Sequence, residues 1–95
     1  KNLYLSFVTE LELLGYTSLN QEDETHIRQF LKQCTIIDIN ASIKEEVIRL
    51  RQLYNPKLPD CIIMASSIHL DIPLITSDKG FKRVEELDLL FYDKS

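Results

Sequence analysis

The sequence predicts an α/β fold in which a parallel sheet is covered by helices on both faces. Short apolar runs alternate along the chain with longer segments whose apolar residues recur at helical spacing. Most of the helical segments follow a serine or asparagine that can cap a helix, and only two glycines and three prolines interrupt the chain. Strands that alternate with helices are typical of parallel sheets, which is why this class is preferred.

Four strands are expected, over residues 3–5, 35–39, 73–76 and 89–92, and residues 93–95 form a polar end. Five helices are expected, over residues 6–16, 20–34, 40–54, 58–70 and 81–87. Ser6, Asn20 and Asn40 are the predicted N-caps of the first three helices. The Asn55-Pro56 pair should stop the third helix, because the residue before a proline disfavours helical geometry.

The length of 95 residues suits one domain, spanning residues 1–95. A net charge of -4 argues against a basic module that coats duplex nucleic acid, although it does not exclude an enzyme acting on nucleic acid. No apolar run approaches the roughly 18 residues of a membrane span, so no membrane partner is expected.

Two cysteines and two histidines offer little chemistry. Cys34 and Cys61 match no metal spacing and are expected to be buried free thiols in a reducing cytosol, which predicts a cytoplasmic protein. His26 and His69 are far apart and lack a partner motif, so zinc is less expected than a hard cation.

Three acids lie at the edges of elements or beside apolar neighbours: Glu12, Asp60 and Asp78. Asp78 directly follows the strand at 73–76, and Asp60 opens the helix before that strand. Sites in parallel sheets lie beyond the carboxyl ends of the strands, so these positions suggest a site for a divalent metal. Converging carboxylates could hold Mg²⁺ or Mn²⁺, and the metal would activate a water for attack on phosphorus.

Each acid also has a simpler interpretation. Asp60 could serve the helix dipole, Asp78 could be a turn residue, and Glu12 could be solvated. Basic side chains that flank two of the acids could meet phosphates; they are Lys57, Lys79, Lys82 and Arg83. The remaining acids, such as Glu45-Glu46 and Glu85-Glu86, are expected to form solvated faces.

Three segments around these acids resemble motifs of the PIN domain family, of the VapC toxin type. Residues 6–13, Ser-Phe-Val-Thr-Glu-Leu-Glu-Leu, resemble "S-x-(V/I)-T-x-x-E-L", whose glutamate falls on Glu12. Residues 57–65 resemble "K-L-P-D-A-x-I-A-A", whose aspartate falls on Asp60. Residues 73–81 resemble "L-(V/I)-T-x-D-x-x-F", which gives Asp78 and a supporting hydroxyl at Thr76. The order and spacing of the three agree across essentially the whole chain.

The resemblance implies a three-layer α/β/α fold and cleavage of RNA that depends on Mg²⁺ or Mn²⁺. It also implies a toxin restrained by a small antitoxin, and often a homodimer. Glu12, Asp60 and Asp78 would be metal ligands or acids just outside the ligand shell. Thr76 would orient a water or a carboxylate.

The sequence departs from the family pattern in two places, and both bear on whether the chain holds a complete site. The family's opening strand, which lies in the middle of its sheet and supplies a first acid, is absent, and Gly80 stands where many members have a further acid. The chain is therefore expected to be the C-terminal part of a domain of roughly 130 residues, an ordinary domain size. The departures also motivate an alternative, a non-catalytic PIN-like interaction module. A third interpretation is a phosphoacceptor domain that uses Asp78 alone.

Overall fold

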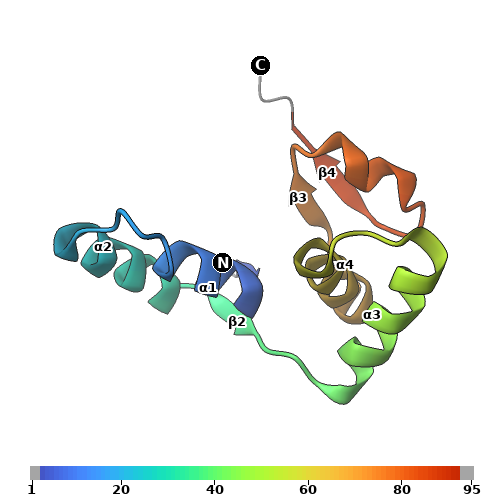
Figure 1. Cartoon of the computed structure of the whole chain (residues 1–95), viewed down its shortest axis with the longest axis horizontal. Coiled ribbons are helices and arrows are strands. Elements are labelled where there is room, and N and C mark those ends of the chain that lie inside the picture. Colours follow the sequence, from blue (N-terminus) through green and yellow to red (C-terminus); the bar gives the residue numbers. More distant parts are fainter. Residues whose placement is uncertain (1–2, 93–95) are drawn as a thin grey trace. The chain divides into compact units, whose positions relative to one another are not determined.

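The computed structural model describes residues 3–92, which form four α-helices, one short 3₁₀-helix and four strands (Figure 1). Their order along the chain is β1 (Tyr4–Ser6), α1 (Phe7–Leu14), α2 (Gln21–Lys32), β2 (Thr35–Ile37), α3 (Ala41–Tyr54), α4 (Leu58–Leu70), β3 (Leu74–Thr76), η1 (Lys79–Arg83) and β4 (Leu89–Phe91). The predicted α/β class is confirmed. The predicted polar end, residues 93–95, lies outside the described residues.

The chain divides into two compact units, residues 1–39 and residues 40–95. In the first unit, β1 and β2 pair in parallel, with Leu5 opposite Ile36, and α1 and α2 connect them. Burial here is sparse. The helical spacing of Phe7, Val8, Leu11 and Leu14 predicts one buried face for α1. Val8 is buried, as is Leu31 of α2, whereas Leu11 is 62% exposed. A unit of this size has too little chain to cover two amphipathic helices, so that expectation is wrong for Leu11.

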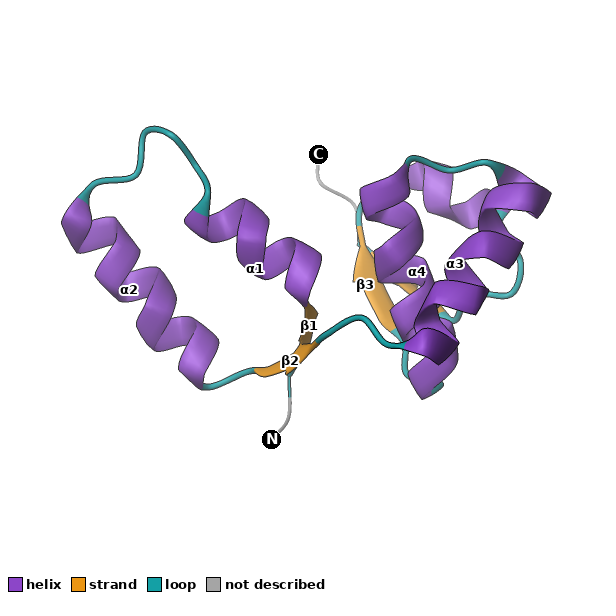
Figure 2. Cartoon of the chain, turned by 60° about the horizontal axis from the view of Figure 1, so that its bottom comes forward, coloured by secondary structure: helices purple, strands orange, loops and turns teal. Residues whose placement is uncertain are grey.

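The second unit contains most of the core. Helices α3 and α4 lie side by side (Figure 2), and β3 pairs with β4 in parallel, with Ile75 opposite Leu90. The largest fully buried side chains of the described residues all belong to this unit, and they come from α3, α4 and the segment after η1: Ile43, Leu50, Met64, Val84 and Cys61. The helical spacing of apolar residues in α3 predicts a stripe of Ile43, Val47, Leu50 and Tyr54. The first three are buried and Tyr54 is half-buried.

Local capping chemistry explains where the helices begin. The Ser6 hydroxyl accepts from the N–H of Val8 at 3.1 Å, and the side chains of Asn20 and Asn40 each accept from the N–H three residues later. All three predicted N-caps are confirmed, since each satisfies a backbone donor that the first helical turn leaves unpaired.

Two helices end in a left-handed residue that is not glycine. Asn55 ends α3 with a φ of 52°, and Asp71 ends α4 with a φ of 55°. The N–H of Asn55 donates to the carbonyl of Arg51 at 3.0 Å, so the turn closes before Pro56 as predicted. Asparagine and aspartate tolerate this conformation better than other side chains do.

The predicted helix over residues 81–87 is wrong in extent and type. Residues Lys79–Arg83 form a 3₁₀-helix, which a turn at residues 85–86 follows. Phe81, Val84 and Leu87 are all buried, and their spacing of three residues is that of a 3₁₀-helix. The same spacing is also compatible with an α-helix, which is why the sequence pattern was misleading here.

Candidate metal site

Asp78 lies two residues past β3 and is the N-cap of η1. Its Oδ1 accepts a hydrogen bond from the backbone N–H of Gly80 at 2.8 Å, and its own N–H donates to Thr76 Oγ1 at 3.0 Å. The side chain is exposed, and Oδ2 has no hydrogen-bond donor among residues 3–92. Two local bonds thus hold an acid with one available oxygen at the carboxyl end of a parallel strand, where sites of such folds lie.

Asp60 lies in the first turn of α4, where it is half-buried. Lys57 is the N-cap of this helix and makes no side-chain capping bond, and Pro59 has no N–H to satisfy. The Asp60 carboxylate is therefore the negative group at the positive end of the helix dipole. Both the predicted dipole role and a metal-binding role fit this position.

Glu12 is an exposed residue of α1 and belongs to the first unit, whereas Asp60, Thr76 and Asp78 belong to the second. Within residues 3–92, no three Asp, Glu, His or Cys side chains are grouped so that they could hold a metal ion. Carboxylate oxygens are nevertheless the donors that Mg²⁺ and Mn²⁺ prefer, so Asp60 and Asp78 fit such an ion by the kind of atom they offer.

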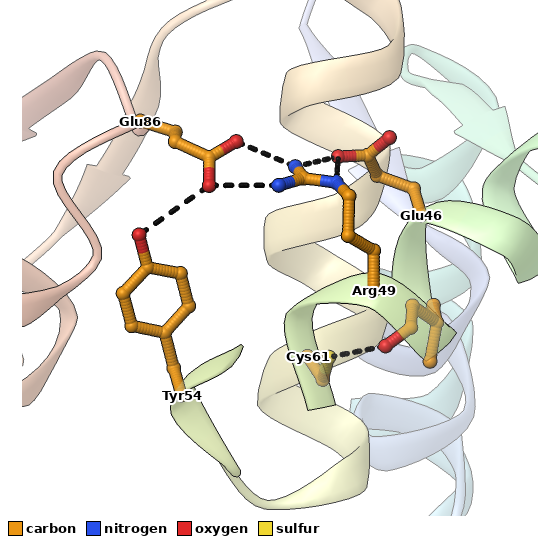
Figure 3. Close-up of polar contacts among 6 residues, drawn as sticks. Glu46, Arg49, Tyr54, Cys61 and Glu86 are labelled. Atoms are coloured by element: carbon orange, nitrogen blue, oxygen red, sulfur yellow. Dashed lines mark hydrogen bonds and ion pairs between the residues drawn. The ribbon is translucent and has the colours of Figure 1, made fainter. Parts of the chain in front are cut away.

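A polar cluster that the sequence did not reveal lies between α3 and the turn after η1 (Figure 3). The Arg49 guanidinium donates to both carboxylate oxygens of Glu86 and also to Glu46 one turn earlier on α3, and the Tyr54 hydroxyl donates to Glu86 at 3.3 Å. Glu86 is exposed, as expected, but it also pairs with Arg49, and Glu46 is half-buried rather than fully solvated. The spacing of Glu46 and Arg49 could have indicated their pairing, but nothing local links Arg49 to Glu86.

The cluster perturbs the acidity of its members. Hydrogen bonds from Arg49 lower the pKa of Glu86 below its ordinary value. The bonds to Glu86 and then Glu46 raise the pKa of Arg49. Desolvation, followed by the nearby charge of Glu86, raises the pKa of the Tyr54 hydroxyl. All three shifts favour the protonation states that the hydrogen bonds require at neutral pH.

Two of the basic side chains expected near phosphates have protein partners. Arg83 donates to the backbone carbonyl of Tyr54 at 2.6 Å, and the Lys82 ammonium lies 3.9 Å from the centre of the Phe91 ring. Lys57 and Lys79 are exposed. Arg83 thus ties η1 to the end of α3, a structural contact rather than a site for an anion.

The thiols follow the sequence expectation only in part. Cys61 is fully buried, and desolvation raises its pKa, while Cys34 is half-buried. Both are free cysteines. Within the described range, no helix has the length and apolar character that crossing a membrane requires.

The fold and the acids together define a class: an α/β protein with an acid at the carboxyl end of a parallel strand and another at the start of the preceding helix. Residues 1–87 match the PIN domain family. The chain belongs to the PIN domain family, and the predicted resemblance to this family is confirmed. No curated protein gives a significant match.

Solved structures of toxin–antitoxin complexes contain similar chains. One, from a toxin-antitoxin complex of Klebsiella pneumoniae, is 32% identical, with a TM-score of 0.78 over 93% of this chain and 72% of that one. A chain of VapBC2 from Rickettsia felis, bound to a DNA fragment from its promoter, is 23% identical, with a TM-score of 0.84 over 97% and 76%. A chain of VapBC-1 from nontypeable Haemophilus influenzae is 22% identical, with a TM-score of 0.81 over 95% and 74%. The last two support the fold alone.

Proposed function

We propose that this chain is the toxin component of a type II toxin–antitoxin pair and that it hydrolyses RNA phosphodiester bonds with the help of Mg²⁺ or Mn²⁺. The match of residues 1–87 to the PIN domain family carries this proposal, because nucleases of this family generally use a divalent metal. The similarity to a chain of a toxin–antitoxin complex, at 32% identity, supports a small antitoxin as the partner.

Asp60 and Asp78 are the proposed metal ligands of the second unit, and Glu12 is the proposed acid of the first. When bound, the metal supplies positive charge at the scissile phosphate and makes a water more acidic. The chain's own residues hold the ligands in place. Thr76 accepts from the N–H of Asp78, and Gly80 donates to its Oδ1, so both would orient the carboxylate that binds the ion.

The substrate, the assembly and the location of the protein follow from the same proposal. A toxin of this kind would act on RNA in the cytoplasm, form a homodimer and bind its antitoxin there. Asp78 and Glu12 are exposed and Asp60 is half-buried, which is compatible with a substrate that brings its own phosphate oxygens to the metal.

We propose also that the chain is the C-terminal part of a PIN domain of roughly 130 residues, whose opening strand supplies a further acid. Within residues 3–92 the strands form two separate pairs, so each strand has a neighbour along only one edge. Ile75 and Leu90 face each other across β3 and β4 and are 60% and 53% exposed, although parallel sheets usually have both faces covered. The three similar chains extend beyond the match, since this chain covers 72–76% of their lengths.

Cleavage of a panel of structured RNAs by the protein with its native N-terminus tests the activity. Asp78→Asn keeps an oxygen that can cap the Gly80 N–H, so it removes the charge while preserving the turn. Loss of a metal ligand is expected to lower the rate in Mn²⁺ by roughly 100-fold or more, in Asp60→Asn as well as in Asp78→Asn. Glu45→Gln, which makes the same charge change at an exposed position of α3, should keep full activity. Full activity in both aspartate variants would refute the proposal.

A second candidate function is a non-catalytic PIN-like interaction module. Gly80, at a position where many members of the family have an acid, favours it. Calorimetric titration with Mn²⁺ separates the two functions. A protein with its native N-terminus that binds no Mn²⁺, yet binds its antitoxin, would be the module and not the nuclease.

A further inference from the structure

We propose that Arg49 and Glu86 are positioning residues for Asp78: together they anchor the segment that Asp78 begins, and so keep its carboxylate in place at the end of β3. The inference rests on the proposed function in treating Asp78 as a metal ligand. It assigns a role to the polar cluster of Figure 3, which the proposed chemistry does not otherwise use.

The contact between Arg49 and Glu86 has the geometry of a two-pronged clamp. Nη1 of Arg49 lies 2.9 Å from Oε2 of Glu86, and Nη2 lies 2.5 Å from Oε1. Such parallel bonds fix the relative orientation of two planar groups as well as their separation. Glu46 contacts the same guanidinium through Nε at 3.1 Å, and Tyr54 donates to Oε2 of Glu86, so side chains of α3 hold both members.

The clamp lies at the far end of the segment that Asp78 caps. Asp78 begins η1 through its bond to Gly80, Arg83 ends η1 with its bond to the Tyr54 carbonyl, and Glu86 lies three residues further on. A 3₁₀-helix of five residues has little stability of its own, so its position depends on its anchors. Polar contacts at both ends of the segment therefore act together with the buried Phe81 and Val84 to hold η1 and, with it, Asp78.

Helix α3 is the shared support of this arrangement. It carries Arg49 and Tyr54, which hold the segment after Asp78, and it packs against α4, whose first turn carries Asp60. Asp60 and Asp78 are thus both positioned by contacts with the same helix. Positional accuracy of this kind is what a carboxylate pair needs to bind a small cation with little adjustment.

A purely stabilising role for the clamp is the competing explanation. The side chains of Arg49 and Glu86 are 41% and 35% exposed, and ion pairs at such exposure add little to global stability. Removing the clamp should then leave the fold nearly as stable as before while loosening the segment from η1 to β4. Local order at Gly80 and overall stability are therefore the two quantities that must be measured separately.

Glu86→Gln is the test, and Glu85→Gln is its matched control. The neighbouring Glu85 is exposed and makes no hydrogen bond or ion pair within residues 3–92, and the charge change is the same. In the metal-free protein, amide hydrogen exchange at Gly80 reports the bond to Asp78 directly. We expect Glu86→Gln to speed this exchange by roughly threefold or more and Glu85→Gln to leave it unchanged. The Mn²⁺ dissociation constant should rise by about threefold to tenfold in Glu86→Gln only.

Equal Gly80 exchange in the two variants would overturn the inference, and so would equal Mn²⁺ affinity in a protein whose unsubstituted form binds Mn²⁺. A fall in the unfolding midpoint of Glu86→Gln by more than about 5 °C would also overturn it, because the clamp would then be a stabilising contact. If the unsubstituted protein binds no Mn²⁺, the proposed function fails, whereas the exchange comparison still decides whether Glu86 positions Asp78.

Discussion

Replacing Gly80 with alanine would show whether the position of the Asp78 carboxylate can be disturbed while the fold stays stable. A Cβ at residue 80 would lie 3.1 Å from Oδ1 of Asp78 and 4.0 Å from its Cγ. That contact is shorter than carbon and oxygen normally allow, so the carboxylate must move by a few tenths of an ångström. The backbone at Gly80 does not have a positive φ, so alanine itself introduces no strain there.

The expected result is a large effect on metal binding with a small effect on folding. The unfolding free energy should change by less than about 1 kcal/mol, because the stiffer unfolded chain offsets the crowded contact. The Mn²⁺ dissociation constant should rise by roughly tenfold, the usual effect of disturbing a group that orients a ligand. Urea denaturation and calorimetric titration measure the two quantities. An unchanged Mn²⁺ affinity would refute the argument that the Gly80 cap orients Asp78.

Gly15→Ala is the contrasting substitution for the stability measurement. A Cβ at residue 15 would lie 2.7 Å from the backbone carbonyl oxygen of Leu11, at the end of α1. A backbone oxygen cannot move aside as a flexible side chain can, so this variant should lose about 1–3 kcal/mol of stability. If Gly15→Ala lost no more stability than Gly80→Ala, the distances expected for a Cβ at residues 15 and 80 would not predict the effect of either substitution.

Two further outcomes follow from shifted acidities and burial. Because Arg49 lowers the pKa of Glu86, the clamp stabilises the fold above the unfolded pKa of this carboxyl and loses that effect as the pH falls through the folded pKa. Acid titration of the unfolding midpoint should accordingly be shallower in Glu86→Gln than in the unsubstituted protein, and an identical pH dependence would count against the ion pair. With a thiol reagent at pH 8, half-buried Cys34 should be modified well before Cys61, because Cys61 is fully buried and burial raises its pKa. Mass spectrometry of timed samples measures the order of modification, and the reverse order would contradict this prediction.

Features that depend on neighbouring residues were readable from the sequence. The caps at Ser6, Asn20 and Asn40 and the stop before Pro56 are confirmed because each involves bonds over two to four residues. The stripe along α3 is confirmed for a related reason. One face of that helix meets α4, its neighbour along the chain, so helical spacing alone decides which side chains become buried.

Features that depend on contacts between residues far apart in the sequence could not be predicted. Arg49 and Glu86 are 37 residues apart, and nothing in either neighbourhood distinguishes Glu86 from the exposed Glu85. Instead of the helix expected over residues 81–87, the structure has a 3₁₀-helix at Lys79–Arg83. The spacing of the buried Phe81 and Val84 fits both helix types, so the pattern could not distinguish them. The motif residues Glu12, Asp60 and Asp78 were identified from the family pattern, and their joint role in one site stays a prediction.

The left-handed residues at the ends of α3 and α4 are positions where a substitution by glycine would make the protein more stable. Asn55 and Asp71 occupy a conformation that glycine adopts without steric cost, and Asp71 also places a negative charge at the end of a helix whose dipole is negative there. Neither residue is one of the acids of the candidate site, and within residues 3–92 Asp71 makes no side-chain hydrogen bond or ion pair with the polar cluster, whereas Asn55 directly follows Tyr54 of that cluster. A more stable protein, in which the acids or the clamp can be substituted without unfolding, is therefore best sought first at Asp71.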